Sequence, residues 1–238
     1  MNPTFLYVMG AEAGVGKSTV CLGILAYLLT QGFKAQELAY IKPMTQCLIP
    51  QNVALFCEQT HIDCCATEGL VFTKDFTRDF IAGLTRNSDE LKQEILNDVY
   101  AIAQQKTFVI IDGIGYPAVG SIIGVSNVDI AMALDSNVIY IAHPGIGKAI
   151  DSTVLNVTFM QSKGINKIGI IFNQLSSTLT TIQPYIDKRL IELLPTTTLL
   201  GFLTKNENLD ELVHNQSIDE ISKWFIENLD TSKLLSQC

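Results

Sequence analysis

The sequence predicts an α/β fold, a doubly wound, mostly parallel sheet with helices on both faces, in a single domain spanning residues 1–238. Three observations predict this fold. Short apolar runs alternate with longer segments of helical periodicity along the chain. The apolar runs are continuous, which is typical of parallel strands buried on both faces. No Pro-, Gly- or Ser-rich linker, repeat or low-complexity segment divides the chain, so one domain is the simplest organisation.

The expected strands are short runs rich in Val, Ile and other apolar residues, most of them ending at a polar residue, Gly or Pro. They lie at Thr4–Met9, Ala35–Ile41, Phe108–Ile111, Asn137–Ala142, Lys167–Phe172 and Thr197–Phe202. The helical segments between them allow consecutive strands to run in the same direction, because a crossover helix returns the chain to the same end of the sheet.

The expected helices carry apolar residues at helical spacing, and Gly, Ser and Pro indicate where several of them begin or end. Ser88 is expected to cap one helix, and Gly32 follows the end of another. The helices are expected at Lys17–Thr30, Gln51–Gln59, Ser88–Gln105, Ala149–Ser162, Thr178–Leu194 and Ile218–Leu229. The segment Asp63–Asn87 shows neither pattern clearly.

The stretch GAEAGVGKST, residues 10–19, follows the first strand and opens the first helix. It matches the phosphate-loop pattern Gly-x-x-x-x-Gly-Lys-Ser/Thr, with Ala11 in place of the first glycine. The context of strand, loop and helix favours a fold of the P-loop NTPase type over a glycine-rich turn that binds nothing. Backbone amides of residues 13–18 are expected to surround a β-phosphate at the helix N-terminus. The expected nucleotide-binding residues are Gly14, Val15, Gly16, Lys17, Ser18 and Thr19.

Lys17 is expected to bridge β- and γ-phosphate oxygens, and the Ser18 hydroxyl to ligate Mg²⁺. Asp112 stands where the strand Phe108–Ile111 leaves the core, so it can reach the same Mg²⁺ directly or through water. The alternative for Asp112 is a turn-forming aspartate before a glycine.

Two further polar residues end predicted strands, where ligands bind in open α/β sheets. Lys42, followed by a proline, can hold a developing anion, although an ordinary surface lysine fits the same position. Asn173 presents a donor and an acceptor that suit a purine edge, and a turn asparagine is the alternative.

Composition narrows the class of partner. The chain is 47% hydrophobic with a formal net charge of −8, and it contains no Lys/Arg cluster, so nucleic acid is a poor partner. No apolar run approaches the ~20 residues that span a bilayer, and residues 1–9 lack the basic start of a signal peptide, so we expect no membrane partner and a cytoplasmic location. The six cysteines lack Cys-x-x-Cys spacing and are expected to be reduced thiols rather than zinc ligands.

The series GAEAGVGKST, IKPMTQ, IIDGIG, HPGIGKAIDSTVLN and GIIFNQL resembles dethiobiotin synthetase and its relatives. These relatives include the N-terminal nucleotide-binding domain of some phosphotransacetylases and the synthetase domains of cobyrinic acid amidation. The resemblance runs in order from residue 5 to about residue 203. The phosphate loop occurs in many families, whereas the order of the five motifs along the chain is considerably more specific to this one.

The resemblance implies closure of a cyclic urea from a diamine carboxylate, 7,8-diaminopelargonate, and CO₂ with ATP and Mg²⁺ as cofactors. It implies that Lys17 and Lys42 are catalytic and stabilise phosphoryl and carbamate oxygens. Ser18 and Asp112 would hold Mg²⁺, and Asn173 would face the adenine. It also implies a homodimer in which the segment Pro144–Lys148 completes the partner's site.

The sequence departs from the family pattern at several positions that bear on function. Ala13 stands where family members commonly carry a hydroxyl residue near the carbamate. Asn52 stands where they place an aspartate as a second Mg²⁺ ligand, and an uncharged amide binds Mg²⁺ more weakly. Asp112 replaces the usual glutamate, which is one methylene longer. These departures affect the diamine half of the site more than the nucleotide half.

Three functions therefore remain open at this point. The first is an ATP-dependent carboligase of the dethiobiotin synthetase type, which turns over ATP only with an amine substrate. The second is a regulatory nucleotide-binding module like the phosphotransacetylase N-terminal domain, which fits Ala13 and Asn52. The third is a switch ATPase of the chromosome-partitioning type, but such proteins usually carry a lysine where this chain has Glu12.

Overall fold

The computed structural model describes residues 3–45, 51–66, 69–176 and 181–237. Its centre is a seven-stranded sheet in the order β4-β2-β6-β1-β7-β8-β9, and the pairings recorded between these strands are parallel. The strands are β1 (Thr4–Gly10), β2 (Leu38–Ile41), β4 (Asp63–Cys65), β6 (Phe108–Asp112), β7 (Asn137–Ala142), β8 (Ile168–Leu175) and β9 (Thr198–Thr204). A smaller sheet pairs β3 (Met44–Thr45) with β5 (Leu70–Val71), also in parallel. The predicted fold class is confirmed.

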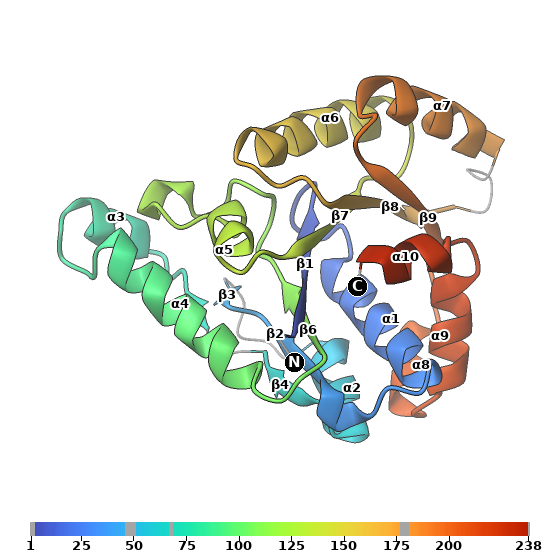
Figure 1. Cartoon of the computed structure of the whole chain (residues 1–238), viewed down its shortest axis with the longest axis horizontal. Helices are drawn as coiled ribbons and strands as arrows, with labels where there is room; N and C mark the ends of the chain where they lie inside the picture. The colour runs from blue at the N-terminus through green and yellow to red at the C-terminus, as the bar shows by residue number, and fades with distance from the viewer. Residues whose placement is uncertain (1–2, 46–50, 67–68, 177–180, 238) are drawn as a thin grey trace.

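Helices cover both faces of the large sheet (Figure 1). One face carries α1, α9 and α10, and the other carries α4, α5 and α6 (Figure 1). The helices are α1 (Lys17–Thr30), α2 (Asn52–Thr60), α3 (Phe76–Ile81), α4 (Ser88–Ile102), α5 (Asn127–Ala133), α6 (Gly147–Ser162), α7 (Gln183–Leu193), α8 (Leu209–His214), α9 (Ile218–Ile226) and α10 (Thr231–Gln237). Two short 3-10 turns, η1 (Ala35–Glu37) and η2 (Ser121–Ile123), complete the regular structure of the described residues.

The helix α1 is buried around most of its circumference, because it packs between the sheet and α9. Its residues from Val20 to Leu28 are buried. Gly23 lets α9 approach closely, since a Cβ there would lie 2.2 Å from the ring of Phe225. A helix that is apolar on nearly all sides needs such cover on both sides.

The strand order places β1 at a topological switch point. The chain leaves β1 through α1 toward β2 on one side, and β7, β8 and β9 lie on the other. In open parallel sheets the crevice for ligands forms at such a point, beyond the carboxyl ends of the strands. Here the segment that follows β1 at this edge is the glycine-rich loop of residues 11–16.

The strand expected at Ala35–Ile41 is wrong in its first half. Residues Ala35–Glu37 form the turn η1, and β2 begins at Leu38. The Lys34 amide donates to the Glu37 carboxylate at 2.8 Å, and this local bond competes with strand pairing.

The cap expected at Ser88 is also wrong by one residue. Asn87 caps α4, because its side chain accepts a bond from the Glu90 amide at 3.0 Å. Ser88 instead donates to the carbonyl of Ile123 at 2.7 Å and ties α4 to η2.

The less legible part of the sequence, Asp63–Asn87, contains β4, β5 and α3, three elements too short for periodicity to identify. The helix expected at Thr178–Leu194 begins at Gln183 in the structure, with Pro184 in its first turn, and its expected start lies outside the described residues. The last expected helix ends as α9 at Ile226, since Gly201 of β9 bridges to Leu229.

Candidate functional site

The phosphate loop leaves β1 at Gly10 and enters α1 at Lys17. Gly14 and Gly16 have φ values of +80° and +88°, a conformation that favours glycine. A Cβ on Gly16 would lie 2.2 Å from Nδ2 of Asn173, so residue 16 is also sterically restricted. The Lys17 Nζ donates to the carbonyl of Glu12 at 3.1 Å and therefore lies along the loop. The strand, loop and helix that the motif requires are all present.

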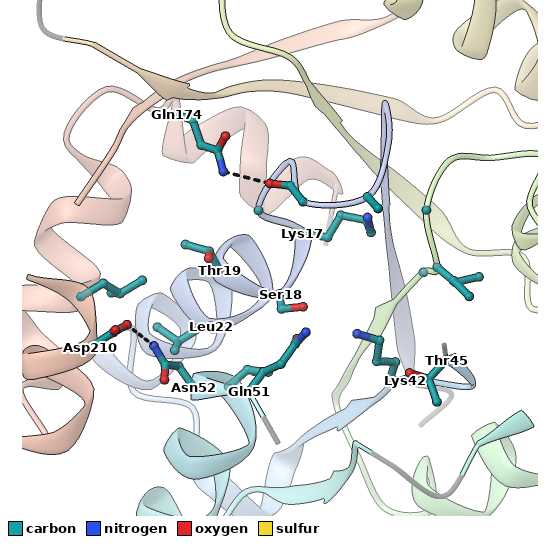
Figure 2. A pocket seen from close by; sticks show the side chains of 18 residues that line it. Lys17, Ser18, Thr19, Leu22, Lys42, Thr45, Gln51, Asn52, Gln174 and Asp210 are labelled. Carbon is teal, nitrogen blue, oxygen red and sulfur yellow. Dashed lines mark hydrogen bonds between the residues drawn. The ribbon is translucent and has the colours of Figure 1, made fainter. Parts of the chain in front are cut away.

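Two neighbouring side chains of β8 donate hydrogen bonds to the phosphate loop. Asn173 Nδ2 donates to the Val15 carbonyl at 2.8 Å. Gln174 Nε2 donates to the Gly14 carbonyl at 3.0 Å (Figure 2). Asn173 is buried, so its side chain has a structural role in shaping the loop. The predicted contact of Asn173 with adenine stays a prediction, and sequence reasoning missed Gln174.

Asp112 ends β6 and lies fully buried opposite the start of α1. Its Oδ2 accepts hydrogen bonds from the Ser18 hydroxyl at 2.5 Å and the Tyr40 hydroxyl at 2.8 Å. Lys42 Nζ lies 3.7 Å from the same oxygen. The structure thus brings Ser18, Lys42 and Asp112 together, as predicted from three separate motifs.

The second oxygen of Asp112, Oδ1, is buried and has no hydrogen-bond partner among the described residues. A buried carboxylate oxygen without a donor is costly, and a cation offsets that cost. Carboxylate and hydroxyl oxygens are also the ligands that Mg²⁺ prefers. Ser18 and Asp112 therefore fit a magnesium ion, with Oδ1 as the oxygen available to it.

Burial changes the proton equilibria of this group. Burial lowers the pKa of Lys17, an effect that the negative charge of Asp112 opposes and the positive charge of Lys42 reinforces. Burial, followed by the charge of Asp112, raises the pKa of the Tyr40 hydroxyl well above its ordinary value. Tyr40 therefore keeps its proton and donates to the carboxylate throughout the neutral range.

A cavity of about 540 Å³ opens over these residues (Figure 2). Lys17, Ser18, Lys42 and Asn52 line it, together with the loop glycines Gly14 and Gly16 and with Thr19. Further residues that line it are Ala13, Leu22, Thr45, Gly113, Ile114, Gly115, Gln174, Leu209 and Asp210. Thr45 lies beside Lys42, whereas Leu22 and Asp210 lie toward the other end, next to Asn52 (Figure 2). The cavity thus extends beyond the phosphate loop in two directions.

Asn52 begins α2 and lies in this cavity. Its Nδ2 donates to Oδ1 of Asp210 at 2.5 Å, a contact that joins α2 to α8 (Figure 2). The amide oxygen remains the atom suited to a metal, so the predicted Mg²⁺ contact stays a prediction. Sequence reasoning missed Asp210, which lies in the first turn of α8 and not at the end of a strand.

A second carboxylate, Glu12, connects the phosphate loop to the start of α6. Its Oε1 lies 3.2 Å from Nδ1 of His143 and 3.6 Å from Nζ of Lys148. Burial lowers the pKa of His143, with the charge of Glu12 opposing the shift. The segment Pro144–Lys148 is therefore tied to the phosphate loop within one chain, a contact that the sequence did not indicate.

Asn127, at the start of α5, fixes the loop that follows Asp112. Its Oδ1 accepts bonds from the Tyr7 hydroxyl and the Ile114 amide, both at 3.1 Å. Its Nδ2 donates to the carbonyls of Ile114 and Tyr116 at 2.6 and 2.8 Å. A fully buried amide with this set of partners holds one wall of the cavity rigid.

A family model described as an AAA domain, the family of dethiobiotin synthetase, matches residues 4–212. The chain belongs to this family. A curated relative, the ATP-dependent dethiobiotin synthetase of Anaeromyxobacter sp. (strain Fw109-5), is 23% identical over 224 residues, covering 92% of this chain and 94% of that protein. The resemblance predicted from the five motifs is confirmed.

Solved structures of two other kinds of protein share the fold. The MinC:MinD cell division protein complex of Aquifex aeolicus matches with a TM-score of 0.59 and 11% identity, covering 94% of this chain and 93% of that one. A putative plasmid partition protein of Borrelia burgdorferi B31 bound to AMPPNP matches with a TM-score of 0.59 and 18% identity, covering 99% and 100%. At these identities the likeness shows the P-loop NTPase fold alone.

Two further features of the described residues concern membranes and metals. No helix among them is long and apolar enough to cross a membrane. Within the same ranges, no group of three or more His, Cys, Asp or Glu side chains is arranged to hold a metal ion. The magnesium fit described above rests instead on Asp112 with a serine hydroxyl, as P-loop sites do when the nucleotide supplies further oxygens.

Proposed function

We propose that this AAA domain is an Mg²⁺- and ATP-dependent carboligase of the dethiobiotin synthetase type, which closes a cyclic urea from a diamine carboxylate and CO₂. One observation carries the proposal: a second lysine, Lys42, lines the cavity beside the phosphate loop and lies 3.7 Å from Asp112. A P-loop needs Lys17 to bind phosphates, but simple nucleotide binding does not need a second cation there. A lysine at that place suits a reaction in which an oxyanion attacks the γ-phosphate.

The reaction has three steps in which atoms balance. One amine of the substrate attacks CO₂, forming a carbamate and releasing a proton. A carbamate oxygen then attacks the γ-phosphorus, and the bond to ADP breaks. The second amine attacks the carbonyl of the mixed anhydride, so that phosphate leaves, the nitrogen gives up a proton and the urea ring closes.

The chain's own residues supply binding and charge in these steps. The backbone of the loop and Lys17 hold the phosphates, and Lys42 neutralises the carbamate oxygen as it approaches them. Ser18 and Asp112 would hold Mg²⁺, which would neutralise charge on the phosphate oxygens. The part of the cavity bounded by Thr45 and Gly113–Gly115 provides room for the diamine next to the transferred group.

The family pattern also suggests a homodimer, and we propose that the segment Pro144–Lys148 lies at its interface. Ile146 in this segment is 39% exposed although apolar, and Leu155 of α6 is 72% exposed. Light scattering after size-exclusion chromatography tests the dimer, and a monomeric mass at micromolar concentration would contradict it.

An isotope experiment tests the chemistry. In bicarbonate labelled with ¹⁸O, the carbamate oxygen that attacks phosphorus stays with the released phosphate. We expect phosphate carrying one ¹⁸O atom per turnover, in a reaction that requires the diamine. Phosphate that takes its oxygen from unlabelled water would indicate simple ATP hydrolysis and would refute the carboligase. The Lys42→Gln variant, which removes the charge and shortens the side chain by one atom, should still bind ATP but lose labelled phosphate.

Two observations favour a regulatory nucleotide-binding module as the second candidate. Ala13 brings no hydroxyl to the cavity, and Asn52 brings an uncharged amide oxygen where the family pattern places a metal-binding aspartate. Such a module binds nucleotide and forms no product. The partitioning type of switch ATPase fits less well, because Glu12 replaces the lysine of those proteins and pairs with His143 and Lys148.

A further inference from the structure

The turn between α2 and β4 brings two cysteines together. The helix α2 ends with His61 in a left-handed conformation at φ +60°, and the amide of Ile62 bonds back to the carbonyl of Cys57 at 2.9 Å. This reversal directs the chain into β4, which packs against α2. Cys57, on the buried side of the helix, then contacts Cys64 of the strand.

The two thiols differ in exposure. Cys57 is 0% exposed, whereas Cys64 is exposed on β4, an outer strand of the large sheet. The hydrogen bond to Cys64, followed by burial, raises the pKa of the Cys57 thiol. Cys57 therefore stays protonated and donates, while Cys64 is the thiol that solvent and reagents reach.

We propose that Cys57 and Cys64 form a redox modification site, which closes an intramolecular disulfide by exchange with a low-molecular-weight disulfide of the glutathione type. The Cys64 thiolate attacks one sulfur of glutathione disulfide and releases one glutathione as thiolate. The Cys57 sulfur then attacks Cys64 in the mixed disulfide, releases the second glutathione and gives up its proton. The two protein thiols are oxidised, one glutathione disulfide is reduced to two glutathiones, and two protons are transferred to them or to solvent.

Strand geometry selects this pair among the neighbouring cysteines. Consecutive residues of a strand point to opposite faces, so Cys64 and Cys65 are directed away from each other. Cys64 stands opposite Tyr40 in the register of β2 and β4, and Cys65 stands opposite Ile41. Cys21 is buried within α1 and does not reach solvent.

The pair lies close to the elements that form the cavity. The helix that carries Cys57 begins at Asn52, which lines the cavity. The strand that carries Cys64 ends at Cys65, whose carbonyl accepts a bond from the amide of Lys42 at 2.9 Å. The disulfide therefore joins α2, which carries the cavity residue Asn52, to β4, whose last residue bonds to the backbone of the cavity residue Lys42.

A peptide-mapping experiment tests the site. Native protein is incubated with glutathione disulfide, quenched in acid, alkylated under denaturing conditions and digested after Lys, Arg and Glu. Glu58 lies between the two cysteines, so the digest separates them into the peptides 38–58 and 59–68. We expect these two peptides to be linked, with fragment ions that place the bond at Cys57 and Cys64 and release by dithiothreitol.

Three variants sharpen the result. Cys65→Ser, a change at the adjacent cysteine, should leave the linked peptides unchanged. Cys57→Ser should instead accumulate a glutathione adduct on Cys64, because no second thiol resolves it. Cys64→Ser should leave Cys57 unmodified in the folded protein.

Several outcomes would overturn the proposal. In the wild type, a stable glutathione adduct on Cys64 beside an alkylated Cys57 would show that the second step does not occur. A bond from residue 47 or residue 65 in place of these cysteines would show that another pair reacts. Loss of the linked peptides in Cys65→Ser would likewise show that Cys65, and not Cys64, forms the disulfide.

Discussion

Tyr40→Phe is the change that tests most sharply how the protein holds its buried carboxylate. The Tyr40 hydroxyl donates to Oδ2 of Asp112 at 2.8 Å, and both residues are fully buried. The substitution removes one oxygen atom and leaves the ring in the core. The burial of Asp112 means that water does not replace the lost donor.

The magnitude follows from the kind of bond. A hydrogen bond to a charged group contributes about 1.5–3 kcal/mol to the free energy of unfolding. For a chain of this size, 1 kcal/mol corresponds to about 2–4 °C in Tm, so Tyr40→Phe should lower Tm by roughly 3–12 °C. Ser18 still donates to the same oxygen, so the fold is expected to survive.

Tyr27→Phe is the matched control. Tyr27 is also buried, in α1, but its hydroxyl makes no hydrogen bond to the described residues. Thermal unfolding followed by circular dichroism at one scan rate, without nucleotide and at pH 7, compares the two variants. The control should change Tm by no more than about 2 °C, as substitutions that remove no interaction do. Equal shifts for the two variants would refute the proposed support of Asp112 by Tyr40.

Three further predictions concern the phosphate loop and its neighbours. Lys17→Ala should abolish ATP binding in a titration while the circular dichroism spectrum stays that of the wild type, and unchanged affinity in a folded variant would refute the assignment of the motif. Gly16→Ala should weaken nucleotide binding by at least about 10-fold, since its Cβ would lie 2.2 Å from a neighbouring amide nitrogen at φ +88°. Gly14→Ala, at φ +80° but with no atom within 4 Å of its Cβ, should weaken binding less, and the reverse order would contradict the packing described. The pKa of His143 is lower in the folded than in the unfolded chain, so the unfolded chain binds the proton more readily. The contribution of the neutral imidazole to the free energy of unfolding should be fully present above pH 6.5 and be lost as the pH decreases through the lowered pKa. His143→Gln should flatten this part of a urea-unfolding pH profile, and an unchanged slope would show that His143 does not cause it.

The residues that sequence analysis identified share one property: each stands at the end of a predicted strand or in a spaced motif. Lys17 and Ser18 follow from the loop pattern, and Asp112 and Lys42 follow from the rule that ligands bind beyond the carboxyl ends of parallel strands. The structure brings all four into contact or into one cavity. The local sequence pattern and the expected sheet topology are enough to predict residues of this kind.

The supporting residues are different, because their partners are distant in sequence. The local sequence pattern predicts Tyr40 only as a core residue of β2, yet its hydroxyl bonds to Asp112, which is 72 positions away in the chain. The local sequence pattern indicates for Asn127 only the start of a helix, yet its side chain accepts a hydrogen bond from Tyr7, which is 120 positions away in the chain. The partnership of Asn52 with Asp210 spans 158 positions. Nothing in a local pattern specifies which distant side chain satisfies a buried polar atom, so these contacts require the folded chain.

The most direct test of the central claim is a coupled product assay by mass spectrometry. Purified protein is mixed with Mg²⁺, ATP, bicarbonate and 7,8-diaminopelargonate, and ADP and dethiobiotin are followed together, with nucleotide binding titrated in parallel. If the protein is a carboligase, we expect ADP and dethiobiotin to appear in equal amounts and neither to appear without the diamine. Binding of ATP with no dethiobiotin and no diamine-dependent ADP would contradict it, and would favour the regulatory module instead.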